Sequence, residues 1–143
     1  MTDLAALRDR AAIEDLIATL GIYLGQERAD DLGDVFAEDV VAQFPGGEPF
    51  QGLDRLKRDA SHDLPQYAGS QHVIANAIVE LDGDEASARA NLIATHATDV
   101  RDRTQHWELG GRYDLGLRRT PYGWRIARLT LTAVWLGGER PGA

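Results

Sequence analysis

The sequence contains no cysteine among its 143 residues, and this absence excludes disulfide bonds, thiolate metal sites and cysteine nucleophiles. A chain without cysteine fits a reducing compartment. The N-terminal segment also lacks an uninterrupted apolar run, because charges at Asp3, Arg8, Glu14 and Asp15 divide it. It therefore predicts neither a signal peptide nor a membrane span, and we expect a cytoplasmic protein with no membrane partner.

Positive charge is scarce as well. The chain has 15 Lys and Arg against 23 Asp and Glu, which gives a formal net charge of -8. Binding to nucleic acid needs clustered Lys and Arg, and the nearest candidates are Arg55, Lys57 and Arg58 on a short helix and Arg118 with Arg119 at a strand end. Both groups are typical of solvated faces, so we exclude a nucleic-acid partner.

The motifs that bind nucleotides and catalytic metals are missing too. Neither G-x-G-x-x-G nor G-x-x-x-x-G-K-[ST] occurs, so nucleotide cofactors have no support. The four histidines show no H-x-H or H-E-x-x-H spacing, which argues against a metal site. No G-x-S-x-G sequence surrounds Ser61, Ser70 or Ser87, which excludes that form of serine nucleophile. We therefore expect no cofactor and no metal.

What is present predicts one α+β domain over residues 1–143, because length and a hydrophobic content of 43% are ordinary globular values. Apolar residues between Leu4 and Leu24 recur at spacings of three and four, which indicates a long amphipathic helix. Shorter helices are expected at residues 30–36 and 53–62, with a strand at 40–44 between them.

After Gly69 the hydrophobic pattern changes to period two, which indicates strands. Four long strands are expected at residues 71–81, 86–98, 105–119 and 123–136, forming an antiparallel meander. Gly110 and Gly111 in mid-strand predict a bulge or bend that curves the sheet. Helices packed into the concavity of such a sheet leave a conical fold that encloses a ligand-sized pocket.

Two histidines are the candidate catalytic residues of that pocket. Alternation places His72 with Ile74, Asn76 and Ile78 on one face of its strand, and His96 on one face of the next. Facing imidazoles in an apolar pocket suit general acid–base chemistry, because histidine titrates near neutral pH. The alternative is that both are hydrogen-bonded core residues.

Aromatic residues and one arginine are candidates for binding a substrate. Tyr23, Tyr67, Tyr113 and Trp107 have the flat side chains that line a pocket and stack on a ligand, although such residues also build plain cores. Arg128 shares a face with apolar Trp124 and Ile126 by alternation. It would then pair with an acid or bind developing negative charge, unless its face is exposed to solvent.

Four segments carry a resemblance to a known family: RAAIEDLIATL, FAEDV, SQHVI around His72, and GGRYDLGLRRTPYGWRIARL. The chain resembles SnoaL-like members of the nuclear transport factor 2-like superfamily, near scytalone dehydratase and hexachlorocyclohexane dehydrochlorinase. The resemblance covers nearly the whole chain. It implies a conical α+β barrel, often a homodimer or homotrimer, and cofactor-free elimination, cyclisation or isomerisation of small apolar molecules.

The resemblance also implies roles for individual residues. A histidine at the position of His72 is the general base in these enzymes, and the dehydratase has a second histidine where His96 falls. The aspartate that faces the base in the enzymes is replaced here by Gly25, followed by Gln26. Glycine cannot stabilise a protonated histidine, whereas the Gln26 amide could orient the ring, so Gln26 joins the candidate substrate-site residues.

Two functions follow from the sequence. The first is a lyase, isomerase or cyclase in which His72 removes a proton and His96 donates or orients, acting on a polyketide-like or aromatic molecule. The second is a non-catalytic ligand-binding or interaction module on the same fold, which Gly25 favours. A structural subunit like the small chain of ring-hydroxylating dioxygenases is a variant of the second.

Overall fold

A computed structural model describes residues 3–140. The helical segments are α1 (Leu4–Gly25), the 3-10 turn η1 (Ala29–Asp34), α2 (Leu53–Asp63) and the 3-10 turn η2 (Leu64–Gln66). The first helix begins where the Asp3 carboxylate accepts a hydrogen bond from the backbone N–H of Ala5 at 2.9 Å. Its buried face, which includes Ile13 and Leu20, packs on the sheet, as the spacing of three and four predicts.

The strands of residues 3–140 form one mixed sheet with six members. The strands are β1 (Phe36–Gln43), β2 (Phe50–Gln51), β3 (Gly69–Asp82), β4 (Glu85–Ala97), β5 (His106–Thr120) and β6 (Gly123–Gly137). Their order is β2-β1-β6-β5-β4-β3, and β1 runs parallel to β6. The predicted four-strand meander is confirmed. The first strand begins four residues earlier than residue 40, because η1 ends at Asp34.

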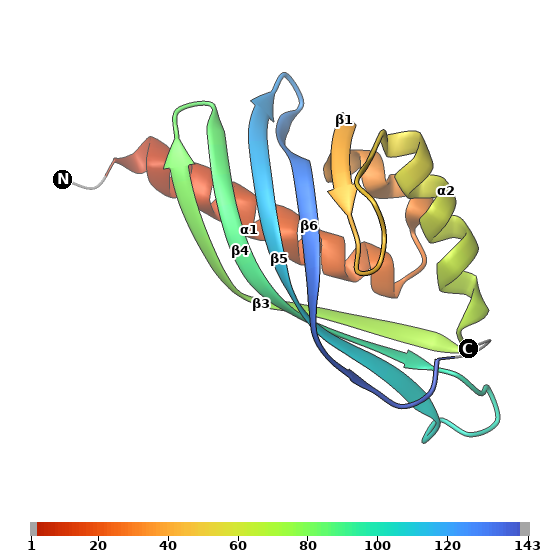
Figure 1. Ribbon diagram of the computed structural model, residues 1–143. Helices are drawn as coiled ribbons and strands as arrows, with labels where there is room; N and C mark the ends of the chain where they lie inside the picture. The colour runs from red at the N-terminus through yellow and green to blue at the C-terminus, as the bar shows by residue number, and fades with distance from the viewer. Residues whose placement is uncertain (1–2, 141–143) are drawn as a thin grey trace.

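The long strands bend so that the sheet wraps around the helices. Figure 1 shows α1 lying along the sheet and α2 beside the β1 end, while the lower half of the meander turns beneath them. The register of β5 against β6 shifts between Gly110 and Gly111, which confirms the predicted irregularity at this pair. Trp135 of β6 covers Gly110, where a side chain would overlap its indole. The bend places the core inside the concavity.

A second irregularity lies in β3 and changes which residues face the core. The register against β4 shifts between Ala75 and Ile78, and Asn76 adopts a positive φ of 59°. Alternation therefore changes phase: Ile78 is 58% exposed, while Val79 is buried. The prediction that Ile78 shares the face of His72 is wrong, because one extra residue reverses every side chain that follows.

A third shift, in β6, moves Arg128 out of the pocket. Gly116 pairs with Arg128 but Leu117 pairs with Ile126, so Ala127 is an extra residue on this strand. Arg128 is consequently exposed on the outer face of the sheet, opposite the buried Ile126. The prediction that Arg128 shares the inner face and binds substrate charge is wrong for this reason.

Helix α1 approaches β3 at glycines. A Cβ at Gly21 would lie 2.9 Å from the backbone carbonyl oxygen of His72, so helix and strand would have to separate. We expect Gly21→Ala to lower the free energy of unfolding by about 1–3 kcal/mol, despite the better helix propensity of alanine. Urea unfolding measures this. Gly33→Ala is the control, because its Cβ would make an ordinary contact at 3.6 Å; equal stability of the two variants would contradict the close approach.

Candidate functional site

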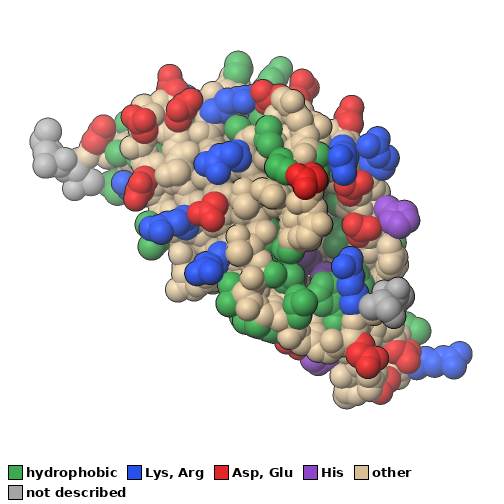
Figure 2. Space-filling view, in the orientation of Figure 1, with side chains coloured by type: hydrophobic (Ala, Val, Ile, Leu, Met, Phe, Trp, Pro, Cys, Tyr) green, Lys and Arg blue, Asp and Glu red, His purple; other side chains and the backbone are tan. Residues whose placement is uncertain are grey.

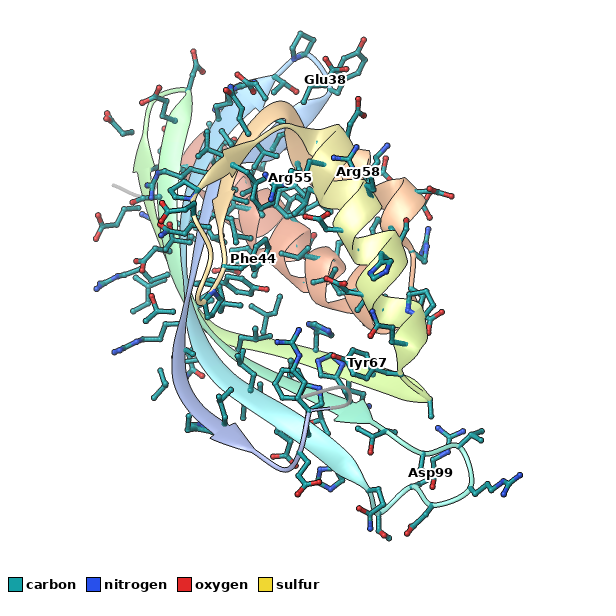
Figure 3. All side chains as sticks on the ribbon, turned by 45° about the vertical axis from the view of Figure 1, so that its right-hand side comes forward. Glu38, Phe44, Arg55, Arg58, Tyr67 and Asp99 are labelled. Carbon is teal, nitrogen blue, oxygen red and sulfur yellow. The ribbon has the colours of Figure 1, made fainter. Side chains whose placement is uncertain are left out.

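A cavity of about 490 Å³ lies between the helices and the concave face of the sheet. Its walls are mainly apolar, with Leu92 from β4, Leu109 from β5 and Leu129 from β6. Figure 2 shows a hollow lined by hydrophobic side chains in which histidine is visible. In Figure 3, Phe44 lies towards the β1 side of this space and Tyr67 lies beneath α2, towards the bent half of the sheet. Such a concave, apolar space suits a small organic ligand.

His72 reaches the cavity from β3, where it is paired with Ala94 of β4. Both its ring nitrogens are enclosed, and neither has a hydrogen-bond partner within residues 3–140. Burial, and secondarily the nearby His96, lowers the pKa of His72 to about 4. The ring is therefore neutral at pH 7, and its nitrogen lone pair accepts no hydrogen bond from the described residues.

His96 lies on the neighbouring strand and is only 6% exposed. The hydroxyl oxygen of Ser70 is 2.7 Å from its Nδ1, which holds the orientation of the ring. Burial, and then the positive charge of Arg140, lowers the pKa of His96 to about 4. A hydroxyl can donate or accept, so the Ser70 contact positions His96 in either neutral tautomer.

The two imidazoles form one aromatic cluster with Tyr67 and Trp107. The rings of His72 and His96 meet edge to face, with centroids 5.5 Å apart. Tyr67 stacks on His96 at 4.1 Å, and the indole N–H of Trp107 donates to the hydroxyl of Tyr67 at 3.2 Å. The predicted approach of the two histidines is therefore present, and Tyr67 and Trp107 pack against the ring of His96.

Other predicted site residues divide between the cavity and its surroundings. Trp107 and Tyr113 line the cavity, and burial raises the pKa of the Tyr113 phenol. Tyr23 is not part of the lining, because its hydroxyl donates to Asp34 at 3.1 Å and its ring stacks under Arg28. Gln26 is exposed after the end of α1 and likewise does not line the cavity.

Sequence reasoning missed Arg140, which lines the cavity from the segment after β6. The period-two signal ends near Leu136, and the only local sign of a turn is the glycine pair that follows. Gly138 has a φ of 77°, a conformation that favours glycine. Phe44 and Phe50, which stack at 6.1 Å, also line the cavity from the β1–β2 region.

No carboxylate within residues 3–140 forms a hydrogen bond or ion pair with His72 or His96. The acidic side chains of the lining are Glu48, Asp59 and Asp63. Over the same residues, no cluster of three His, Asp or Glu side chains is arranged to hold a metal ion, and no helix is long and apolar enough to cross a membrane. The inner cavity thus combines neutral imidazoles with apolar walls.

The sequence model of the SnoaL-like domain family matches residues 5–130. This chain belongs to the SnoaL-like family. An uncharacterised protein of Mycobacterium tuberculosis is 32% identical over 132 residues, covering 90% of this chain and 87% of the relative. The predicted family membership is confirmed, and so is the α+β cone.

Solved structures of similar proteins share the fold of this SnoaL-like chain. A protein from Kribbella flavida has a TM-score of 0.87 at 24% identity, covering 92% of this chain and 95% of its own. A hexachlorocyclohexane dehydrochlorinase from Novosphingobium barchaimii has a TM-score of 0.82 at 17% identity, with 99% and 97% covered. At these identities the likeness shows the fold, and the chemistry must be argued from the residues themselves.

Gly25 allows a direct test of the missing acid in this SnoaL-like chain. A Cβ there would lie 3.4 Å from the Ser70 carbonyl oxygen and 3.8 Å from the His72 backbone nitrogen, so a side chain fits with a small adjustment. We expect Gly25→Asp to raise the pKa of His72 from about 4 towards its ordinary 6.5, because a nearby carboxylate favours imidazolium.

An NMR titration of the His72 ring protons measures that pKa. Gly25→Asn is the matched control, because it has the same shape without the charge. Equal His72 pKa values in the Asp and Asn variants would show that residue 25 does not act on this imidazole.

Proposed function

We propose that this protein is a cofactor-independent lyase, isomerase or cyclase that acts by histidine acid–base catalysis on a small, largely apolar molecule of polyketide-like or aromatic type. The observation that carries the proposal is the pair of neutral, buried imidazoles of His72 and His96 bordering an apolar cavity. Two findings support the proposal: the chain belongs to the SnoaL-like family, and it shares its fold with a dehydrochlorinase.

In the proposed reaction His72 takes a proton from an acidic C–H group of the bound molecule. The electron pair of the broken bond moves onto an adjacent carbonyl oxygen, or expels a leaving group in an elimination. Because neither imidazole is protonated at pH 7, the proton that His72 takes is the one that it later gives to a different carbon, to the oxygen or to the departing group. His96, held by Ser70, orients the bound molecule through a hydrogen bond.

Hydrogen–deuterium exchange tests this chemistry without knowledge of the natural substrate. 2-Tetralone is a flat, largely apolar ketone with acidic C1 protons, and their replacement in D2O is followed by NMR. We expect the wild-type protein to accelerate exchange, and we expect the exchange rate with His72→Ala to be about a hundredfold lower than with the wild type. His106→Ala is the control, because His106 is half-exposed and contacts Glu108. Exchange at the wild-type rate in His72→Ala would contradict the proposal.

A non-catalytic ligand-binding module is the second candidate. The enclosed nitrogens of His72 and the low pKa of both histidines favour it, because a weakly basic, shielded imidazole is a poor proton acceptor. Saturable binding of 2-tetralone with no exchange above that of buffer, unaffected by His72→Ala, would support the module and contradict the enzyme.

Assembly and location belong to the same proposal. Val73 and Ile93 lie opposite one another on the outer face of the sheet and are 53% and 47% exposed, which suits a homodimer or homotrimer formed through the sheet. A mass from sedimentation equal to that of one chain would contradict this. A cytoplasmic location is proposed because a chain without cysteine fits a reducing compartment.

A further inference from the structure

The chain returns to the cavity after the last strand. Gly138 has a φ of 77°, and a Cβ there would overlap the carbonyl oxygen of His106 and come within 2.9 Å of the Trp107 Cα. Only glycine fits this turn without strain or collision. The turn directs the following residues across the start of β5, where Trp107 faces the cavity.

This return places a guanidinium group at the cavity. The Cζ atom of Arg140 lies 5.4 Å from the centroid of the Trp107 ring, and Arg140 is part of the cavity lining. Its charge also acts on His96, whose protonation it opposes. Arg140 therefore lies on the same side of the cavity as the aromatic cluster that holds the two histidines.

Arg140 differs from the other cation of the lining, Arg55. Arg55 is 3.6 Å from the Asp59 carboxylate and stacks on Phe50 at 4.2 Å, so its charge has a partner. Arg140 has no carboxylate within ion-pair distance in the described part of the chain. The protein has a net charge of -8, yet Arg140 borders the cavity with no acidic partner among residues 3–140.

We propose that the cavity receives a flat, apolar molecule that carries a carboxylate, and that Arg140 binds this carboxylate while the rings lie against Trp107. A guanidinium offers two parallel N–H donors that match the two oxygens of a carboxylate, and the side chain of Arg140 is exposed, so these donors are open to a ligand. The inference rests on the proposed function only for the reaction that follows binding.

The bound carboxylate has a consequence for the two histidines. Without a ligand, Arg140 repels a proton on His96, and no protein carboxylate offsets this in the described residues. A negative charge held by Arg140 neutralises that repulsion. The molecule that binds would thus supply, next to the imidazoles, the negative charge that the protein itself lacks at Gly25.

A matched pair of probes tests the inference by isothermal titration calorimetry. 2-Naphthoate and 2-naphthamide have the same rings and nearly the same shape, but only the first is charged at pH 7. We expect the wild-type protein to bind 2-naphthoate at least about tenfold more tightly than 2-naphthamide, as suits a charge-assisted hydrogen bond. Arg140→Gln should bind 2-naphthoate and 2-naphthamide with about equal affinity, and its affinity for 2-naphthamide should match that of the wild-type protein.

Two further variants identify the cause. Arg101→Gln removes an exposed arginine that is not part of the cavity lining and should keep the full preference. Gly138→Ala leaves Arg140 in the chain but disrupts the turn that presents it, and should lose the preference like Arg140→Gln.

The outcomes separate this inference from the proposed function. A wild-type preference near onefold, or a preference that survives in Arg140→Gln, overturns the role of Arg140 even if His72-dependent exchange of 2-tetralone is found. A preference that depends on Arg140, together with no exchange in any variant, supports the carboxylate site and contradicts the enzyme. Failure of both probes to bind overturns the site as well, because the cavity would then not accept flat aromatic molecules.

Discussion

Acidification from pH 7 to pH 4.5 is expected to destabilise the wild-type protein by about 2 kcal/mol more than it destabilises a His72→Leu variant. The pKa of His72 is about 4 in the folded protein and 6.5 in the unfolded chain. Between these values the unfolded chain binds a proton that the folded protein does not. The free energy of unfolding is therefore free of this proton-linked loss above pH 6.5, and the loss grows as the pH falls towards 4.

Urea unfolding followed by circular dichroism at several pH values measures this slope. Carboxylates held by arginines, such as Asp9 and Asp39, have lowered pKa values and lose their own contribution at still lower pH. That loss is common to all variants, so the difference between curves isolates His72. His62→Leu is the control, because the His62 side chain is 79% exposed and its removal should leave the slope unchanged. A His72→Leu curve parallel to the wild-type curve would contradict the burial of a neutral imidazole.

His72→Leu is also expected to be more stable than the wild-type protein at pH 7.5, by about 1–2 kcal/mol, while losing the exchange activity. The two ring nitrogens of His72 are buried without a hydrogen-bond partner, and each such group costs about 1–3 kcal/mol of desolvation. Leucine fills a similar volume and has no polar atom. The expected gain is smaller than the sum because leucine cannot reproduce the shape of the ring.

His96→Leu is the matched comparison for the free energy of unfolding, because His96, unlike His72, has a hydrogen-bond partner. It would give up the Ser70 contact and the stacking on Tyr67, so we expect this variant to be less stable than the wild-type protein. A His72→Leu protein destabilised to the same extent would show that the nitrogens of His72 are satisfied, for example by ordered water. The opposite signs expected for two neighbouring histidines are the measurable sign of a residue kept for function at the expense of stability.

The elements of the fold were predictable because their signals are local. The spacing of apolar residues indicated α1, and strict alternation along β4 placed Ala94 and His96 inside without error. The glycine pair at Gly110 and Gly111 correctly indicated an irregularity in the pairing of β5 with β6, where Val134 of β6 is the extra residue. These predictions depend on neighbouring residues alone, and they are correct wherever the strands pair without a register shift.

The failures lie where the ladder is irregular. The extra residues near Asn76 and at Ala127 reverse the faces that follow, so Ile78 and Arg128 point outwards against the alternation. Asn76 has a positive φ, which asparagine tolerates better than most residues, but an asparagine within a strand pattern is too weak a signal to predict a bulge. A bulge is decided by the partner strand, which the local sequence does not describe.

The sequence alone determined that His72 lies inside a curved α+β sheet with His96 beside it, because the bulge in β3 comes after His72 and β4 has no extra residue. Only the tertiary structure decided what surrounds them. Helix α1 lies against β3 at Gly21 and Gly25, so no acid from this helix faces His72, and the turn at Gly138 brings Arg140 to the cavity in place of Arg128. These contacts join segments far apart in the chain, and no periodicity within either segment encodes them.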